Sequence, residues 1–310
     1  MSTTAIVKGH HMRKLAVGEY AKVAEGAYLE GLSYDSGRDV IWYSDVIGGG
    51  IHGVKPEGTW VASFDLDRMW TGGVLLNADG AVLSSGAGGI RWNHPDTGRS
   101  GWLLKELEGR PINGINEMWP DGTGGIFFGT SDIERVAQAQ PTRPTAIYRL
   151  TSAGRVIKLA EDVVFSNGIA HDERRHRLYC SDTFNVAWAW DVETDLTLSR
   201  RRILVKKDDC DGMALDSDGN VWITGFRSPG ILTRVTPDGE ILSSVRTPEG
   251  STTQIRFGGA DLKDYFINIV PADGGDSLKN GEPLKSPSIL YRGRSEIAGV
   301  AVSPANFELR

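Results

Sequence analysis

The chain has 310 residues, of which 40% are hydrophobic and 24% charged, and this composition excludes a disordered or fibrous protein. Its 34 Lys and Arg against 40 Asp and Glu give a formal net charge of -6, the wrong sign for binding nucleic-acid phosphates, and no apolar run approaches the roughly 18 residues of a membrane-spanning helix. Residues 1–27 also lack the apolar centre of a secretory signal, so we expect a cytoplasmic protein. We expect a small-molecule substrate and neither a nucleic-acid nor a membrane partner. A monomer is the default expectation, and an oligomer stays open.

A repeating unit runs through most of the chain. Each copy has an apolar stretch, a polar turn rich in Asp, Gly and Ser, and a second apolar stretch of alternating character. The copies span 31–45, 75–86, 118–130, 169–182, 213–225 and 255–269. Their turn residues, which are Ser36, Asp79, Asp121, Glu173, Asp218 and Leu262, are 43, 42, 52, 45 and 44 residues apart.

This period predicts the fold class. Each unit contains one hairpin and leaves room for two more strands. In four of the six units, β-branched and aromatic residues flank an Asp-Gly or Asp-Ser-Gly turn. Units of about 40 to 50 residues are typical of propeller blades. The sequence therefore predicts an all-β, six-bladed β-propeller with four-stranded blades, as a single domain over residues 1–310. Residues 1–20 are then an N-terminal extension or a closing strand.

The longest interval contains an insertion at residues 131–145. Helical spacing of Ile133, Val136 and Ala137 precedes Pro141 and Pro144, which end the pattern. The inserted residues belong in a loop between strands. Two interpretations stay open, a lid over a central site and a solvated connector.

Three polar residues stand in register before apolar strands, each followed directly by glycine. They are Glu30, Asn167 and Asp211. For any one of them, a turn dipeptide or an acid paired with Arg is the simpler interpretation. Three equivalent positions instead favour groups that converge on the propeller axis. Two carboxylates and an amide oxygen suit one divalent cation, calcium or zinc first, with manganese or magnesium as alternatives.

Several of these segments resemble a known family. Residues 30–34, 165–170, 211–223 and 257–262, with their Asp-Gly-Met and Phe-Gly-Gly sequences, are similar to those of the senescence marker protein/gluconolactonase/luciferin-regenerating enzyme family. The resemblance covers roughly residues 20–305. It implies a six-bladed propeller with one axial divalent cation held by Glu30, Asn167 and Asp211, and for many members a lactonase activity.

The same resemblance implies two substrate-binding residues, Asn116 and, more loosely, Glu134 in the inserted loop. This chain departs from the family around Asn116. Gly114 stands where an Arg is common, and Glu117 stands where an Asp is common. Without a cation to hydrogen-bond a polyol, and with Trp119 close by, we expect a substrate less polar than a sugar lactone.

A metal-dependent hydrolase that opens a lactone or related cyclic ester fits these residues best. An incompletely ligated cation activates water, Asp211 serves as both ligand and general base, and Asn116 donates to the developing oxyanion. A non-hydrolytic lyase or isomerase acting on a carbonyl substrate, or a propeller that only binds a ligand, remains the alternative. No Gly-x-Ser-x-Gly motif supports a serine nucleophile.

Histidine, tryptophan and cysteine each have a structural alternative to a functional role. His171, four residues after Asn167, lies on the same strand face if the strand alternates regularly, which makes it a candidate for the pocket. Trp119 is a second candidate, although tryptophans in such folds usually pack between blades. Cys180 and Cys210 are expected to be buried thiols without a metal or redox role.

Overall fold

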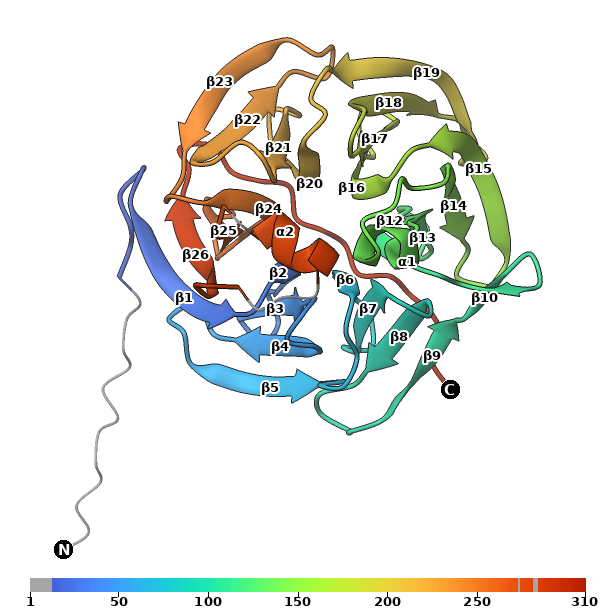
Figure 1. Ribbon diagram of the computed structural model, residues 1–310, viewed down its shortest axis with the longest axis horizontal. Coiled ribbons are helices and arrows are strands. Elements are labelled where there is room, and N and C mark those ends of the chain that lie inside the picture. Colours follow the sequence, from blue (N-terminus) through green and yellow to red (C-terminus); the bar gives the residue numbers. More distant parts are fainter. Residues whose placement is uncertain (1–12, 273, 281–283) are drawn as a thin grey trace, which may run out of the picture.

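The computed structural model describes residues 13–272, 274–280 and 284–310. They form an all-β propeller, with antiparallel sheets arranged around a central axis (Figure 1). Four of the sheets have four strands each. Their strands are β2 (Leu29–Asp35), β3 (Val40–Asp45), β4 (Ile51–Val54) and β5 (Trp60–Phe64); β6 (Thr71–Leu76), β7 (Val82–Gly86), β8 (Ile90–Asn93) and β9 (Ser100–Leu104); β12 (Ile115–Pro120), β13 (Ile126–Thr130), β14 (Thr145–Leu150) and β15 (Val156–Val163); and β16 (Ser166–Asp172), β17 (Arg177–Asp182), β18 (Val186–Val192) and β19 (Leu198–Val205).

An eight-stranded sheet completes the ring. Its strands are β20 (Cys210–Leu215), β21 (Val221–Gly225), β22 (Ile231–Val235) and β23 (Ile241–Arg246), followed by β24 (Ser251–Gly258), β25 (Asp264–Val270), β26 (Ser288–Arg294) and β1 (Tyr20–Gly26). The two halves meet at a single pairing between Gly225 and Thr252. A short hairpin of β10 (Glu106–Leu107) and β11 (Arg110–Pro111) lies outside these sheets.

The first strand of the described chain pairs with the last. β1 runs antiparallel to β26, from Tyr20 opposite Gly293 to Gly26 opposite Ser288. The pairing joins the N-terminal part of the chain to its C-terminal part and so closes the ring. Residues 1–12 of the expected N-terminal extension lie outside the described residues.

Six inner strands surround the axis. β2, β6, β12, β16, β20 and β24 each contact the next in this order, and β24 contacts β2 (Figure 1). β12 and β24 therefore lie on opposite sides of the axis, separated by two inner strands in each direction. The side chains that project from this ring can meet although they are far apart in sequence.

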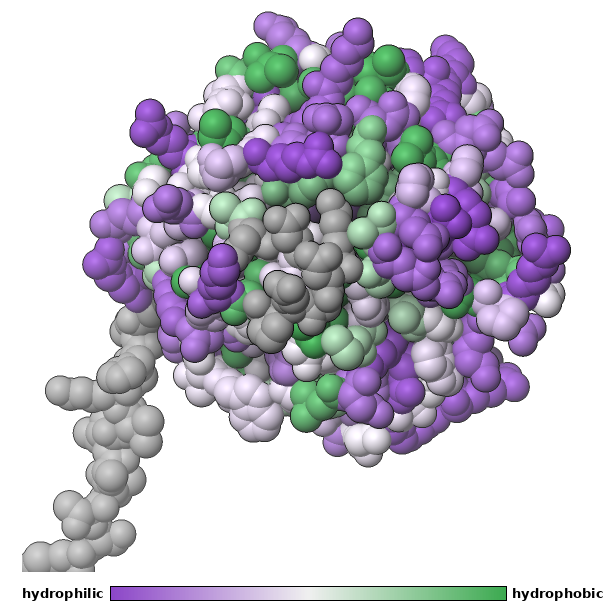
Figure 2. Space-filling model, in the orientation of Figure 1, coloured by the Kyte–Doolittle hydropathy of each residue, from purple (hydrophilic) through white to green (hydrophobic). Residues whose placement is uncertain are grey.

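Two helices lie over the centre of the ring in the view of Figure 1. α1 (Ile133–Ala137) falls in the insertion, where helical spacing was expected, and contacts α2 (Gly274–Asn280), which the sequence did not predict. Hydrophilic side chains predominate around the rim of this face (Figure 2). Among the described residues, none of the helices has the length and apolar character needed to cross a membrane.

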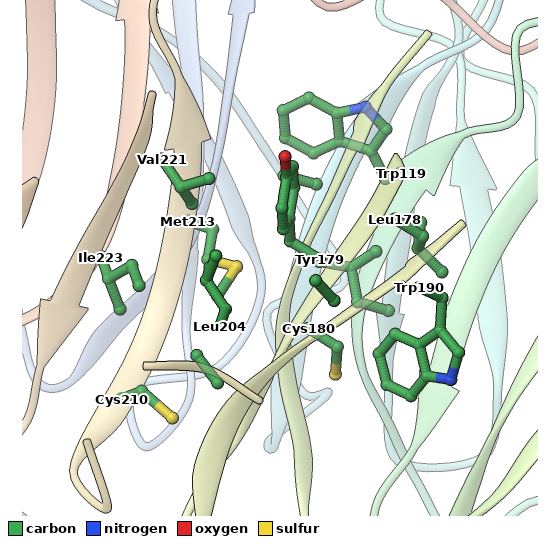
Figure 3. Packing of buried hydrophobic residues seen from close by; sticks show 14 of the residues in the cluster. Trp119, Leu178, Tyr179, Cys180, Trp190, Leu204, Cys210, Met213, Val221 and Ile223 are labelled. Carbon is green, nitrogen blue, oxygen red and sulfur yellow. The ribbon is translucent and has the colours of Figure 1, made fainter. Parts of the chain in front are cut away.

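The core lies between the sheets. Its largest apolar cluster joins residues of β12 through β22, including Trp119, Tyr179 and Met213 (Figure 3). Cys180 and Cys210 are separate buried thiols in the same cluster, as the sequence predicts. Burial raises the pKa of the Cys180 thiol to about 12, which keeps it protonated and unreactive at neutral pH.

Candidate metal and substrate site

A β-bulge occurs at the same point of every inner strand. In β2, Leu29 pairs with Asp45 and the next pairing joins Leu32 to Tyr43, so two residues fall outside the ladder. In each of the other inner strands, the pairing likewise advances three residues along the inner strand for two residues along its partner. The residue pairs released in this way are Glu30-Gly31, Gly72-Gly73, Asn116-Glu117, Asn167-Gly168, Asp211-Gly212 and Thr253-Gln254. A bulge redirects side chains, and all of these pairs lie on the inner strands that surround the axis.

Buried acids fix the chain where it enters the bulged strands. The carboxylate of Asp45 accepts hydrogen bonds from the backbone N–H of Ala27, at 2.7 Å, and of Tyr28, at 2.9 Å. Asp182 accepts one from Phe165 N–H at 2.9 Å. Each acid is the last residue of the second strand of its sheet. The hairpin therefore positions Tyr28 and Phe165, which lie two residues before Glu30 and Asn167.

A pocket of about 110 Å³ opens at the level of the bulges. It brings together four predicted site residues, Glu30, Asn116, Asn167 and Asp211, from four different inner strands. Asp211 is 2% exposed and Asn167 is 6% exposed, whereas Glu30 and Asn116 are partly accessible through the pocket. The volume corresponds to roughly a few water molecules, so this inner part of the pocket suits a small reacting group.

The carboxylates of the pocket repel one another in a desolvated setting. Burial raises the pKa of Glu30 to about 8, and the nearby charge of Glu117 contributes to the rise. Burial, and then Glu30, raises the pKa of Asp211 well above its usual range. Burial, followed by the charges of Glu30 and Asp211, also raises the pKa of the Tyr28 phenol. Among the described residues that line the pocket, none is Lys or Arg, so no positive side chain of the lining offsets these carboxylates.

The donor set fits a divalent cation. Oδ1 of Asp211 is buried and has no hydrogen-bond partner among the described residues. Buried polar atoms are usually paired, so an unpaired carboxylate oxygen beside a second acid indicates a position for a cation. For a cation bound there, Glu30 and Asp211 would supply two donors and the amide oxygen of Asn167 a third. A cluster of three or more His, Cys, Asp or Glu side chains suited to a metal is not found in the described parts of the chain.

Apolar groups form most of the pocket wall. Phe184 packs edge to face against Phe165 and Phe226, with ring centroids 6.1 Å and 5.8 Å apart. α1 contributes Ile133 and Val136, and α2 contributes Gly275 and Leu278. The remaining lining residues are Tyr28, Val46, Trp70, Thr71, Gly72, Ile115 and Thr183.

Gly114 explains how α1 reaches the pocket. A Cβ atom at this position would overlap with the Cδ1 atom of Ile133. Ile133 thus occupies the space beside the backbone of Gly114, and a larger residue there would displace it. At the position where the family that this chain resembles commonly has an Arg side chain, the space is thus occupied by the apolar side chain of Ile133 from α1.

The structure does not bring three other predicted residues to this pocket. Trp119 and His171 line a different cavity, together with Gly299 and Val300 of the C-terminal segment. Trp119 packs in the core cluster (Figure 3), and Phe127 packs edge to face on His171 at 5.1 Å. The structure places both outside the pocket that holds Glu30, Asn167 and Asp211, and a role for either in binding substrate stays a prediction.

Glu134 lies on the exposed side of α1 and is not among the residues that line the pocket. Its carboxylate accepts a hydrogen bond from Asn113 Nδ2 at 3.2 Å. Since Ile133 and Val136 are the α1 residues that line the pocket, Glu134 is on the other face of this short helix. A role for Glu134 in contacting substrate stays a prediction, and the contact would require α1 to move.

Sequence reasoning missed the aromatic wall. Tyr28 precedes Glu30 by two residues, and Phe165 precedes Asn167 by two residues, so an equivalent position holds an aromatic ring in both sheets. A comparison of the residues two positions before Glu30 and Asn167 would have identified both aromatic rings from the sequence. Phe184 and Phe226 lie in the loops after β17 and β21, and the sequence has no comparable signal for them.

Comparisons with known proteins cover most of the chain. Residues 29–270 match the family described as SMP-30/Gluconolactonase/LRE-like region. The chain is 24% identical to pentonolactonase XacC of Haloferax volcanii over 254 residues, which are 78% of this chain and 81% of that protein. It is 26% identical to 6-deoxy-6-sulfogluconolactonase of Pseudomonas putida over 240 residues, or 74% and 79% of the two chains. Its fold is similar to that of a calcium-binding protein, regucalcin, from Agrobacterium tumefaciens, with a TM-score of 0.75, 19% identity, and 94% and 98% of the chains covered.

Proposed function

Because the chain belongs to the SMP-30/gluconolactonase/LRE-like family, we propose that it is a divalent-metal-dependent hydrolase that opens a lactone or related cyclic ester. The lactonase names of two relatives support hydrolysis, and the calcium-binding description of a structural neighbour supports a cation. The observation that carries the proposal is the meeting of Glu30, Asn116, Asn167 and Asp211 in one pocket.

The proposal includes a six-bladed ring that forms one domain. The eight-stranded sheet divides into β20 to β23 and β24 to β26 with β1, which are joined by one pairing. Six inner strands with equivalent bulges support this division, because each blade of a propeller contributes one inner strand. Each blade then has four strands.

In the proposed mechanism, Glu30, Asn167 and Asp211 hold the cation. Bound there, a divalent cation supplies Lewis acidity that polarises an ester carbonyl and lowers the pKa of water. Asp211 removes a proton from the attacking water and can return it to the ring oxygen as the ester C–O bond breaks. The amide of Asn116 donates a hydrogen bond to the carbonyl oxygen as negative charge develops.

The wall of the pocket supports a substrate less polar than a sugar lactone. Phe184, Phe226 and Leu278 offer apolar surface, and Ile133 fills the space beside Gly114. A polyol bound there would lose hydrogen bonds to water without replacing them, which opposes binding. We propose that α1, within the 131–145 insertion, acts with α2 as a lid that completes this wall.

The test is acid release from two lactones of contrasting polarity, dihydrocoumarin and glucono-1,5-lactone, in the presence of Mn²⁺ or Ca²⁺. We expect a kcat/KM at least tenfold higher for dihydrocoumarin, loss of activity with a chelator, and recovery when metal is returned. Asp211→Asn should lower kcat by about 10²- to 10⁴-fold, the range for a lost general base. Asp208→Asn, which changes an exposed acid nearby, is the matched control and should retain activity.

Two results would count against this proposal, the first against its mechanism and the second against hydrolysis. Turnover that is insensitive to both the chelator and Asp211→Asn would overturn the mechanism. Metal binding without acid release from any lactone would instead support a lyase, an isomerase or a ligand-binding propeller. Monomeric state, cytoplasmic location and the identity of the native cation stay predictions.

A further inference from the structure

A hydrogen bond crosses the propeller axis next to the pocket. Gln254 Nε2 on β24 donates to Glu117 Oε2 on β12, and these two inner strands lie on opposite sides of the ring. Both residues occupy the second position of their bulge, directly after Asn116 and Thr253. Both are 2% exposed, so the bond is made in a dry interior.

The other four inner strands have glycine at this second bulge position, at Gly31, Gly73, Gly168 and Gly212. A Cβ atom on Gly73 would overlap with Glu117 Oε1, and one on Gly212 would overlap with Gln254 Oε1. The missing side chains are therefore what allows two long side chains to meet across the axis.

The pair has a fixed orientation. Glu117 Oε1 accepts a hydrogen bond from Met118 N–H at 2.9 Å, and Gln254 Oε1 accepts one from Ile255 N–H at 2.9 Å. The amide nitrogen of Gln254 is thereby turned towards Glu117. Arg256, whose Nη2 atom lies 3.7 Å from Glu117 Oε2 and whose guanidinium stacks on Trp119, adds a positive charge on the same side.

We infer that Glu117 and Gln254 are a positioning pair, which fills the axis beside the pocket and, with Glu117 ionised, holds a negative charge that strengthens divalent-cation binding by Glu30, Asn167 and Asp211. This inference rests on the proposed function. Glu117 follows Asn116 directly, so the charge stands one residue from the pocket. Gln254 Oε1 lies against Gly212, which directly follows Asp211, so the pair also contacts the backbone beside a second proposed ligand.

The charge and the hydrogen bond can be separated by substitution. Glu117→Gln removes the charge and retains the length of the side chain. The double variant Glu117→Gln/Gln254→Glu returns one acid and one amide to the axis, in exchanged places. Glu57→Gln removes an exposed carboxylate from a turn and serves as the control for net charge.

The readouts are the Kd for Mn²⁺ from calorimetry on metal-free protein, and the melting temperature as a measure of folding. We expect Glu117→Gln to weaken Mn²⁺ binding about tenfold or more, because a charge near a divalent ion in a desolvated site is weakly screened. The exchanged double variant should bind Mn²⁺ within about threefold of the wild type, as should Glu57→Gln.

The outcomes separate this inference from the proposed function. Wild-type protein that binds no Mn²⁺ or Ca²⁺ would overturn both. Wild-type binding with an equal affinity in folded Glu117→Gln would overturn only the positioning role. If Glu117→Gln does not fold, the exchanged variant decides, and a tenfold loss of Mn²⁺ affinity in that variant, when folded, would contradict the inference.

Discussion

At the scale of single residues, His171 shows what burial does to a titratable group. It is 6% exposed, and desolvation is the main cause that lowers the pKa of its imidazole below 6.5. The folded protein therefore holds His171 neutral, whereas the unfolded chain binds a proton below about pH 6.5. Stability linked to this group is present above that pH and is lost as the pH falls towards the lower folded pKa.

We predict that His171→Gln reduces the loss of stability on acidification. The difference in free energy of unfolding between wild type and variant should change by up to about 1.4 kcal/mol per pH unit below 6.5. Urea unfolding at pH 7.5, 6.5 and 5.5 measures this difference. Parallel pH profiles for the two proteins would show that His171 is not held neutral.

The same residue shows where prediction from sequence stops. Glu30, Asn167 and Asp211 could be identified because each polar residue precedes a glycine in the same register. Counting four residues from Asn167 along a regularly alternating strand predicts that His171 lies on the same face as Asn167. Asn167 lies in a bulge, however, and one extra residue changes the face on which all later side chains point.

At the scale of elements, the bulged inner strand is the unit that builds the site. Its glycines are required by close contacts with neighbouring bulges and not by unusual torsion angles. A Cβ atom on Gly168 would overlap with the backbone oxygen of Asp211 and lie 2.8 Å from Gly212 Cα. Asn167 and Asp211 are therefore held by the direct contact of two neighbouring bulges.

We predict that Gly168→Ala destabilises the protein by about 1–3 kcal/mol, the usual cost of overpacking, and weakens cation binding by displacing Asp211. Gly37→Ala is the control, because its Cβ would be 3.4 Å from Asp35 Oδ1, an ordinary contact in an exposed turn. That variant should stay within about 0.5 kcal/mol of the wild type. Urea unfolding tests both, and equal stabilities would refute the contact argument.

The two helices differ in how far sequence could find them. α1 has Ile133, Val136 and Ala137 at helical spacing and was expected. α2 begins with Gly274-Gly275, and glycine is a poor helix former, so local propensity gives no indication of a helix. Its Leu278 packs against the cluster of Tyr28, Val46 and Val270, which indicates that tertiary contacts stabilise this helix.

At the scale of the molecule, the C-terminal segment ties separate sheets together. Val300 N–H donates to Leu215 O at 2.9 Å, and Asn306 N–H donates to Gly124 O at 2.8 Å. Phe307 N–H bonds to Asn77 Oδ1 at 2.8 Å. Figure 1 shows the segment crossing the middle of the ring towards β9. The repeat period in the sequence predicts the propeller. It does not predict this crossing, because the C-terminal segment has no repeat pattern of its own.

The central claim is that one divalent cation binds where the inner strands meet. Anomalous diffraction from crystals grown with Mn²⁺ tests it most directly. The account predicts one strong peak in contact with the side-chain oxygens of Glu30, Asn167 and Asp211, and no peak there in crystals of Asp211→Asn. A wild-type map without a peak at these three residues, at a Mn²⁺ concentration that saturates the protein in solution, would contradict it.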